Sequence, residues 1–146
     1  MKDEKDTFSR RILNMESDLK QRTKTFALRI MKLYSALPRR GDAKVLGNQI
    51  LRSGTSVGAH YREACRAKSN ADFISKVEGV LQELDETAYW LELLGEAQIL
   101  PVKRLQALHD EAEKLIAILV TIATKVKRKI SKRNSLATVF RPVPIN

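Results

Sequence analysis

The chain of 146 residues is poor in the residue types that mark several protein classes. It holds one cysteine, four prolines, six glycines and only 5% aromatic residues. Because a single thiol, Cys65, cannot close a disulfide within the chain, nothing implies an oxidising compartment. The scarcity of aromatics, glycine and proline argues against a β-sandwich and against disorder, and it favours helices.

Long apolar runs are also missing. The longest, Leu115–Ala123, is far shorter than the ~20 residues that a membrane-spanning helix needs. The segment Met1–Arg11 is charged throughout and lacks the apolar core of a signal peptide. We therefore expect a cytoplasmic protein.

Positive charge is what the chain has in excess, with a formal net charge of +10. Residues 10–68 hold 14 Lys/Arg against four Asp/Glu, whereas residues 69–114 hold four against ten. Residues 115–146 hold seven cations and no acid. Such an uneven distribution indicates basic surfaces that suit a polyanion.

The apolar pattern predicts four helices in one all-α domain. Apolar residues recur at intervals of three, four and seven, and Pro38, Gly41 and Pro101 interrupt the pattern. The predicted helices begin near residues 18, 42, 69 and 101, and Asp42 and Ser69 are the expected N-caps of the second and third. Short connections favour an antiparallel up-down four-helix bundle.

The bundle is expected to occupy residues 18–132, between two segments with weaker patterns. Residues 1–17 form an N-terminal extension that the sequence leaves ambiguous. Residues 133–146 contain two prolines and no apolar period, which predicts a flexible basic tail.

Apolar residues outside the core stripes predict a second buried surface, because a monomeric bundle needs one stripe per helix. Gly54 and Gly58, one turn apart in a helix, suggest that another helix backbone approaches closely. Self-association explains both features. The alternatives are that helix ends and loops of the same chain cover the apolar residues, and that a long, well-packed helix simply tolerates the glycines. The predicted interface consists of Gly54, Gly58, Tyr89, Trp90, Leu93, Ile116 and Val120.

Two groups of cations are the candidate nucleic-acid-binding residues. The first lies on one face of the second predicted helix, and the second puts six cations into nine residues at the end of the fourth. Helix C-termini favour cations only within the last turn, which does not account for six. The candidates are Lys44, Arg52, Arg62, Arg66, Lys125, Lys127, Arg128, Lys129, Lys132 and Arg133.

No catalytic or metal-binding motif accompanies these cations. His60 and His109 lie on different predicted helices, and no Cys/His cluster has metal-ligand spacing, so we expect no metal and no cofactor. Some helical ribonucleases use an arginine followed by a histidine, but Arg52 and His60 stand farther apart than that motif requires. We therefore expect a protein that is not an enzyme.

Three segments, residues 49–64, 72–76 and 83–91, resemble the signature of a bacterial four-helix-bundle family encoded in intervening sequences of 23S rRNA genes. The resemblance spans about residues 18–125. It implies an antiparallel bundle that assembles as a ring-like homopentamer. The family is similar in fold to the accessory protein of diversity-generating retroelements, a basic pentamer that binds nucleic acid and a reverse transcriptase.

Two classes of function follow from the charge and the resemblance. The first is a basic oligomer that binds nucleic acid, with structured RNA the expected ligand, through the phosphate backbone, because the aromatics that stack on bases are missing. The alternative is a protein–protein adaptor, for a reverse transcriptase or nuclease for example, without a direct nucleic-acid role. A membrane partner is not expected.

Overall fold

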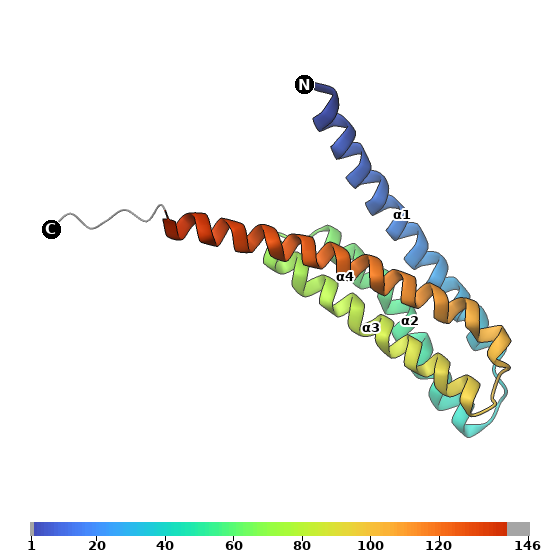
Figure 1. Ribbon diagram of the computed structural model, residues 1–146. Helices are drawn as coiled ribbons and strands as arrows, with labels where there is room; N and C mark the ends of the chain where they lie inside the picture. The colour runs from blue at the N-terminus through green and yellow to red at the C-terminus, as the bar shows by residue number, and fades with distance from the viewer. Residues whose placement is uncertain (1, 140–146) are drawn as a thin grey trace.

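The computed structural model describes the backbone of residues 2–139, with side chains except at positions 2, 3, 5, 6 and 8. Its four helices are α1 (Lys2–Ser35), α2 (Gly41–Cys65), α3 (Asn70–Glu96) and α4 (Val102–Val139). Consecutive helices run in opposite directions and lie side by side, with α2 between α1 and α3 (Figure 1). This arrangement confirms the expected antiparallel four-helix bundle.

Two helices are longer than the sequence pattern predicted. The segment 2–17 belongs to α1 rather than to a separate extension, and residues 133–139 continue α4 rather than starting a flexible tail. The cause is local: neither residues 2–35 nor residues 102–139 contain a proline or glycine, so nothing stops helix propagation. The remainder of the predicted tail, residues 140–146, lies outside the described residues.

The core consists of apolar side chains contributed by all four helices. Phe26 of α1, Ile50 of α2, Leu84 of α3 and Leu119 of α4 each have no exposed surface. Their spacing follows the three-and-four pattern of the sequence, which places them on the inner face of each helix. Over residues 2–139, no helix carries an apolar stretch long enough to cross a bilayer.

The two glycines of α2 are explained by a contact within the chain. A Cβ added to Gly54 would lie 2.7 Å from Cγ1 of Ile30, and one added to Gly58 would lie 3.3 Å from Oγ1 of Thr23. Both neighbours belong to α1. The close helix approach is therefore confirmed, but its assignment to an interface between copies is wrong, since α1 of the same chain fills the space.

Of the two N-caps expected from the sequence, one is confirmed and one is wrong. Ser69 caps α3 by accepting the N–H of Asp72 at 3.1 Å. Asp42 is not the N-cap of α2; that position is Arg40, and Asp42 lies in the first turn. At the end of α3, Gln98 adopts a left-handed conformation with φ 57°, and Gly95 is buried inside the helix against Val102.

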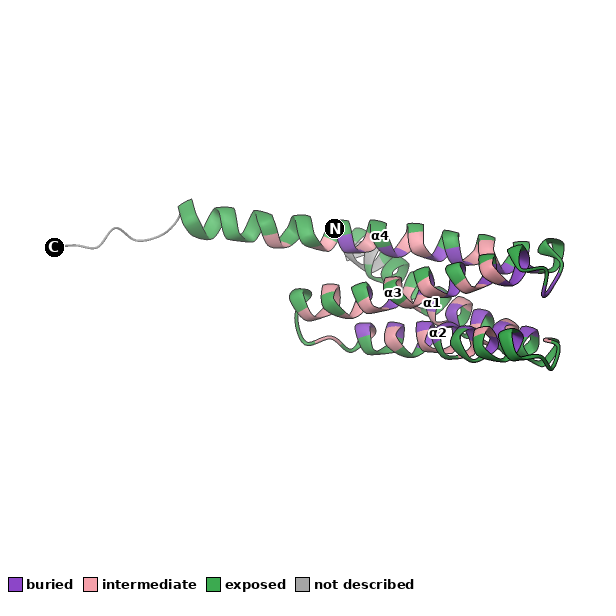
Figure 2. Cartoon of the chain, turned by 90° about the horizontal axis from the view of Figure 1, so that it is seen from below, coloured by how far each residue is buried: buried purple, intermediate pink, exposed green. Residues whose placement is uncertain are grey.

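α1 and α4 each extend past the buried part of the bundle. Leu19 is the first buried residue of α1, and Ala123 is the last of α4. We call residues 2–18 the α1 extension and residues 124–139 the α4 extension. The two extensions leave the same end of the bundle and diverge (Figure 1), and the last turns of α4 are exposed on all sides (Figure 2).

Candidate nucleic-acid interface

The four α2 cations do not form the single ladder that the sequence predicted. Arg52 is bound to α3: its guanidinium lies 3.3 Å from Glu83 and also pairs with Glu86. These carboxylates, with the Glu86 hydrogen bond foremost, raise the pKa of Arg52 above its usual value. Arg52 therefore serves as a contact between helices, and its positive charge is compensated by two carboxylates.

His60 contributes to the same polar cluster between α2 and α3. Its Nε2 atom lies 3.8 Å from Glu83 Oε1, and its Nδ1 atom lies 3.6 Å from Glu63 Oε2. The fold thus brings Arg52 and His60 to one shared carboxylate, although seven residues separate them in the sequence. Within residues 2–139 no group of three or more His, Cys, Asp and Glu side chains is arranged to hold a metal ion.

Lys44 lies at the opposite end of α2 from Arg66. It lines a hollow at the α1–α2 turn together with Arg39 and Arg40. Because 22 residues of helix separate the two positions, they are about 33 Å apart at ~1.5 Å per residue. Lys44 therefore does not share a surface with the cations at the other end of α2.

At that other end, the fold joins α2 to α4. Arg66 and Lys68 line one hollow with Lys76, and Lys68 lines a second hollow with Arg133 of α4. The two groups of cations predicted separately thus meet at the α2–α3 turn. Lys68 is the residue that connects them, and the sequence analysis missed it, although its position two residues after Arg66 was visible.

The cations of the α4 extension point to three sides of the helix. Lys127 points toward α3, where its Nζ lies 3.1 Å from Glu78 Oε1. Lys125 and Lys129 follow Glu111 by 14 and 18 residues, so they share the side on which Glu111 pairs with Arg22 of α1. Arg128 follows Leu119 by nine residues, or 180° at ~100° per residue, and faces away from the core.

We call the exposed cations gathered here the cationic end. Each member has an exposed side chain, and the set draws on α2, the α2–α3 turn and α4. Arg62, another exposed α2 cation, lies one turn before Arg66 on the same helix. The cationic end comprises Arg66, Lys68, Lys125, Arg128, Lys129, Lys132 and Arg133.

The predicted oligomer interface divides into exposed and partly buried residues. Tyr89 and Val120 are 53% and 46% exposed, which leaves them available to another molecule. Trp90 and Ile116 instead pack against the core from its edge, and Leu93 is half-buried. The indole N–H of Trp90 is buried without a hydrogen-bond acceptor. The ring centroids of Tyr89 and Trp90 lie 5.1 Å apart.

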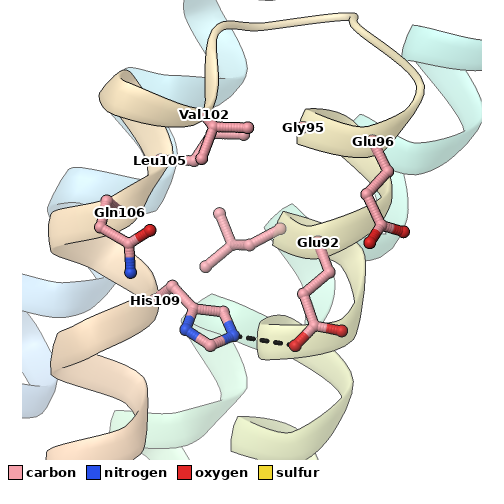
Figure 3. Close-up of a pocket in the computed structure, with 8 residues that line it drawn as sticks. Glu92, Gly95, Glu96, Val102, Leu105, Gln106 and His109 are labelled. Carbon is pink, nitrogen blue, oxygen red and sulfur yellow. Dashed lines mark hydrogen bonds and ion pairs between the residues drawn. The ribbon is translucent and has the colours of Figure 1, made fainter.

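A hollow of about 350 Å³ lies at the far end of α3 from the cationic end (Figure 3). Glu92 and Glu96 line its α3 wall, and Gln106 and His109 line its α4 wall. His109 Nε2 lies 2.9 Å from Glu92 Oε1, which links the two walls. Two carboxylates and no lysine or arginine line this hollow, which makes it unsuited to phosphate, so the candidate interface is restricted to the cationic end.

Comparison with known families decides what kind of bundle this is. The model of the 23S rRNA-intervening sequence proteins matches residues 15–121. The chain belongs to this family. Residues 2–14 and 122–139, which include most of both extensions, lie outside the matched range of the 23S rRNA-intervening sequence protein model.

A solved structure supports the same assignment. The crystal structure of a protein of unknown function from the S23 ribosomal protein family of Bacteroides thetaiotaomicron has a TM-score of 0.68 and 39% sequence identity. The match covers 72% of this chain and 97% of that one. No curated protein matches the chain.

Proposed function

We propose that this member of the 23S rRNA-intervening sequence protein family is a non-enzymatic nucleic-acid-binding protein, with structured RNA as its ligand. The observation that supports this is the cationic end, where exposed cations from α2, the α2–α3 turn and α4 adjoin. Arginine holds phosphate oxygens with two parallel hydrogen bonds and lysine as a point charge. The surface therefore binds the backbone and not the bases.

The absence of aromatics at the cationic end supports the same mode of binding. Among the described residues, the exposed aromatics are Tyr34 and Tyr89, on α1 and α3. Tyr34 lies at the opposite end of the bundle, beside Lys44. Base stacking on aromatic rings gives single-strand binding proteins much of their affinity. Without it, we expect weak sequence preference and strong salt dependence.

We further propose that copies of the chain associate, as a homopentamer in line with the family resemblance. The exposed side chains of Tyr89 and Val120 support association, because both are large apolar groups on the outer surfaces of α3 and α4. Repetition of one cationic end around an assembly raises affinity without a new contact. Sedimentation velocity at micromolar concentration tests this, and a stable monomer contradicts it.

A salt titration tests the binding proposal. We expect the affinity for an RNA hairpin to fall with salt, with a log–log slope of about −5 if about six phosphates are contacted at ~0.9 each. The double substitution Arg128→Glu, Lys132→Glu should weaken binding by at least about ten-fold, since each charge reversal removes a phosphate contact and adds repulsion.

The matched control is Lys103→Glu, Arg104→Glu, which reverses two exposed cations at the other end of the same helix. Equal losses from both pairs would show a response to net charge alone. A slope near zero would instead favour the adaptor function. RNA that is cleaved by the wild-type chain and left intact by His60→Ala would overturn the non-enzymatic part of the proposal.

A further inference from the structure

The core stripes of α1 and α4 continue past the point where their neighbours end. On α1, Ile12 and Met15 precede the buried Leu19 by seven and four residues, so they lie on the same face. On α4, Val126 and Ile130 follow Leu119 by seven and eleven residues and lie on its face. Both extensions thus present residues of core type where α2 and α3 no longer cover them.

The two α1 residues border an open groove of about 450 Å³. Ile12 and Met15 form its α1 wall, and both are nearly half exposed, at 44% and 45%. Tyr61 of α2, Phe73 of α3 and Ile122 of α4 form its floor. α1 and α4 diverge at this end of the bundle (Figure 1).

The length of the two extensions matches that of a short helix. The segment from residue 2 to Met15 is about 21 Å long, and that from Ile122 to Val139 is about 27 Å, at ~1.5 Å per residue. A helix of about four turns laid between them would extend the bundle. Its apolar stripe would meet the two stripes that the extensions leave uncovered, which is the helix-in-groove mode of recognition.

The charge around the groove selects an acidic occupant. Lys125 and Lys129 lie on the α4 side that faces α1, and Ile118 and Ile122 lie on that side too. Lys68 lines the groove from the α2–α3 turn. The carboxylate of Glu16, which also lines the groove, is paired with Lys20 at 3.1 Å. The cations therefore exceed the acids along this opening.

Two helix surfaces of a second copy are poor matches for the groove. Its α4 extension would bring like charges against Lys125 and Lys129. The outward face of α3 is acidic, but Tyr89 is its single large apolar side chain among Ser75, Glu78, Gln82, Asp85, Glu92 and Glu96.

We infer that the groove between the two extensions is a docking site for an acidic amphipathic helix of a protein partner. The apolar stripe of that helix packs on Ile12, Met15 and Ile122, and its carboxylates pair with Lys68, Lys125 and Lys129. This site shares Lys68, Lys125 and Lys129 with the cationic end, whereas Arg128, on the outward side of α4, belongs to the nucleic-acid surface alone. Most of the groove lining falls within residues 15–121, the range of the family match, whereas Ile12 and Ile122 fall outside it.

A designed peptide provides the direct test. A labelled 16-residue peptide carrying leucine at positions three and four apart and glutamate elsewhere should bind the full-length protein in fluorescence anisotropy. A peptide of the same composition in scrambled order should bind at least ten-fold more weakly, since it lacks the stripe. Equal affinity of the two peptides would overturn the inference.

Paired substitutions locate the binding. Met15→Glu should weaken peptide binding at least ten-fold, whereas Leu28→Glu, on the same helix, exposed and outside the groove, should leave it unchanged. Both changes affect exposed side chains, so the fold is retained; circular dichroism checks this. An unchanged affinity of Met15→Glu would overturn the site.

Two further arms separate other occupants and the proposed function. Loss of self-association in Met15→Glu, or Met15-dependent binding to phosphatidylserine vesicles, would show that a second copy or a lipid surface occupies the groove and would overturn the inference. Arg128→Glu should weaken RNA binding and leave peptide affinity within two-fold. The two proposals can therefore fail separately.

Discussion

The buried bundle and the two extensions obey different physical rules, although the same two helices run through both. In the bundle, α1 and α4 are held by side chains such as Phe26 and Leu119, which have no exposed surface. In the extensions no described side chain is buried. The family match covers residues 15–121, so the shared part of the chain is the part that packs. Side-chain packing thus holds together the part of the chain that the family shares, whereas the extensions carry exposed side chains, many of them charged.

The largest expected effect contrasts one apolar side chain from each region. Phe26→Ala should lower the free energy of unfolding by about 3–5 kcal/mol, because it leaves a cavity in the core. Leu136→Ala, in the α4 extension where Leu136 is 58% exposed, should change it by less than about 0.5 kcal/mol. Urea unfolding measures both, and similar losses would show that the α4 extension is packed.

Two glycines of the bundle should respond in opposite directions to the same substitution. Gly54→Ala should destabilise by about 1–3 kcal/mol, because the new Cβ meets Ile30 at 2.7 Å. Gly79→Ala should stabilise by about 0.5–1 kcal/mol, because nothing lies within 4 Å and alanine favours the helix. Thermal unfolding measures whether each substitution raises or lowers the stability. Stabilisation by Gly54→Ala would contradict the close approach of α1 to α2.

A pair of arginines separates cations that hold the fold from cations that are free to bind. Arg52→Ala should cost up to about 1 kcal/mol of stability, since Arg52 is exposed to solvent while it bridges to α3. It should leave RNA affinity within about two-fold. Arg128→Ala should do the reverse, and filter binding with thermal unfolding measures both. A loss of RNA affinity in Arg52→Ala would support the predicted binding face along α2.

The smallest effect concerns Cys65, at the boundary between the regions. Burial raises the pKa of the Cys65 thiol above the usual 9.0, and the thiol also lines the groove. At pH 8 its thiolate fraction is therefore lower than in the unfolded chain, and alkylation by iodoacetamide should be several-fold slower in native protein than in urea. Mass spectrometry follows the rate; equal rates would contradict the burial.

The helices of the bundle could be predicted from the sequence because apolar residues repeat at helical spacing within each of them. Leu19, Phe26 and Ile30 repeat at seven and four, and Ser69 with Asp72 marks a helix start. The extensions were harder to predict, because a stripe without a packing partner looks weak in sequence. Ile12 and Met15 belong to that stripe, yet charged residues surround them.

The candidate site could be predicted only in part, because some of its contacts join residues that are far apart in the sequence. Lys129 and its neighbours stand together in the sequence and remain together in the fold. Arg52 has the same appearance in the sequence, but α3 brings Glu83 and Glu86 to it from 31 and 34 residues away. Lys68 lines one hollow with Arg66 and another with Arg133, and this placement depends in the same way on how the helices meet.

The solitary end of α4 has a consequence for exchange of backbone amides with solvent. Its hydrogen bonds lie within the helix, so they open by fraying from the C-terminus without unfolding of the bundle. Amides near Leu119 should exchange only on global opening, and those beyond Lys132 orders of magnitude faster. A molecule that binds the end of α4 should therefore slow amide exchange only in the last turns of the helix, at the residues that the molecule covers.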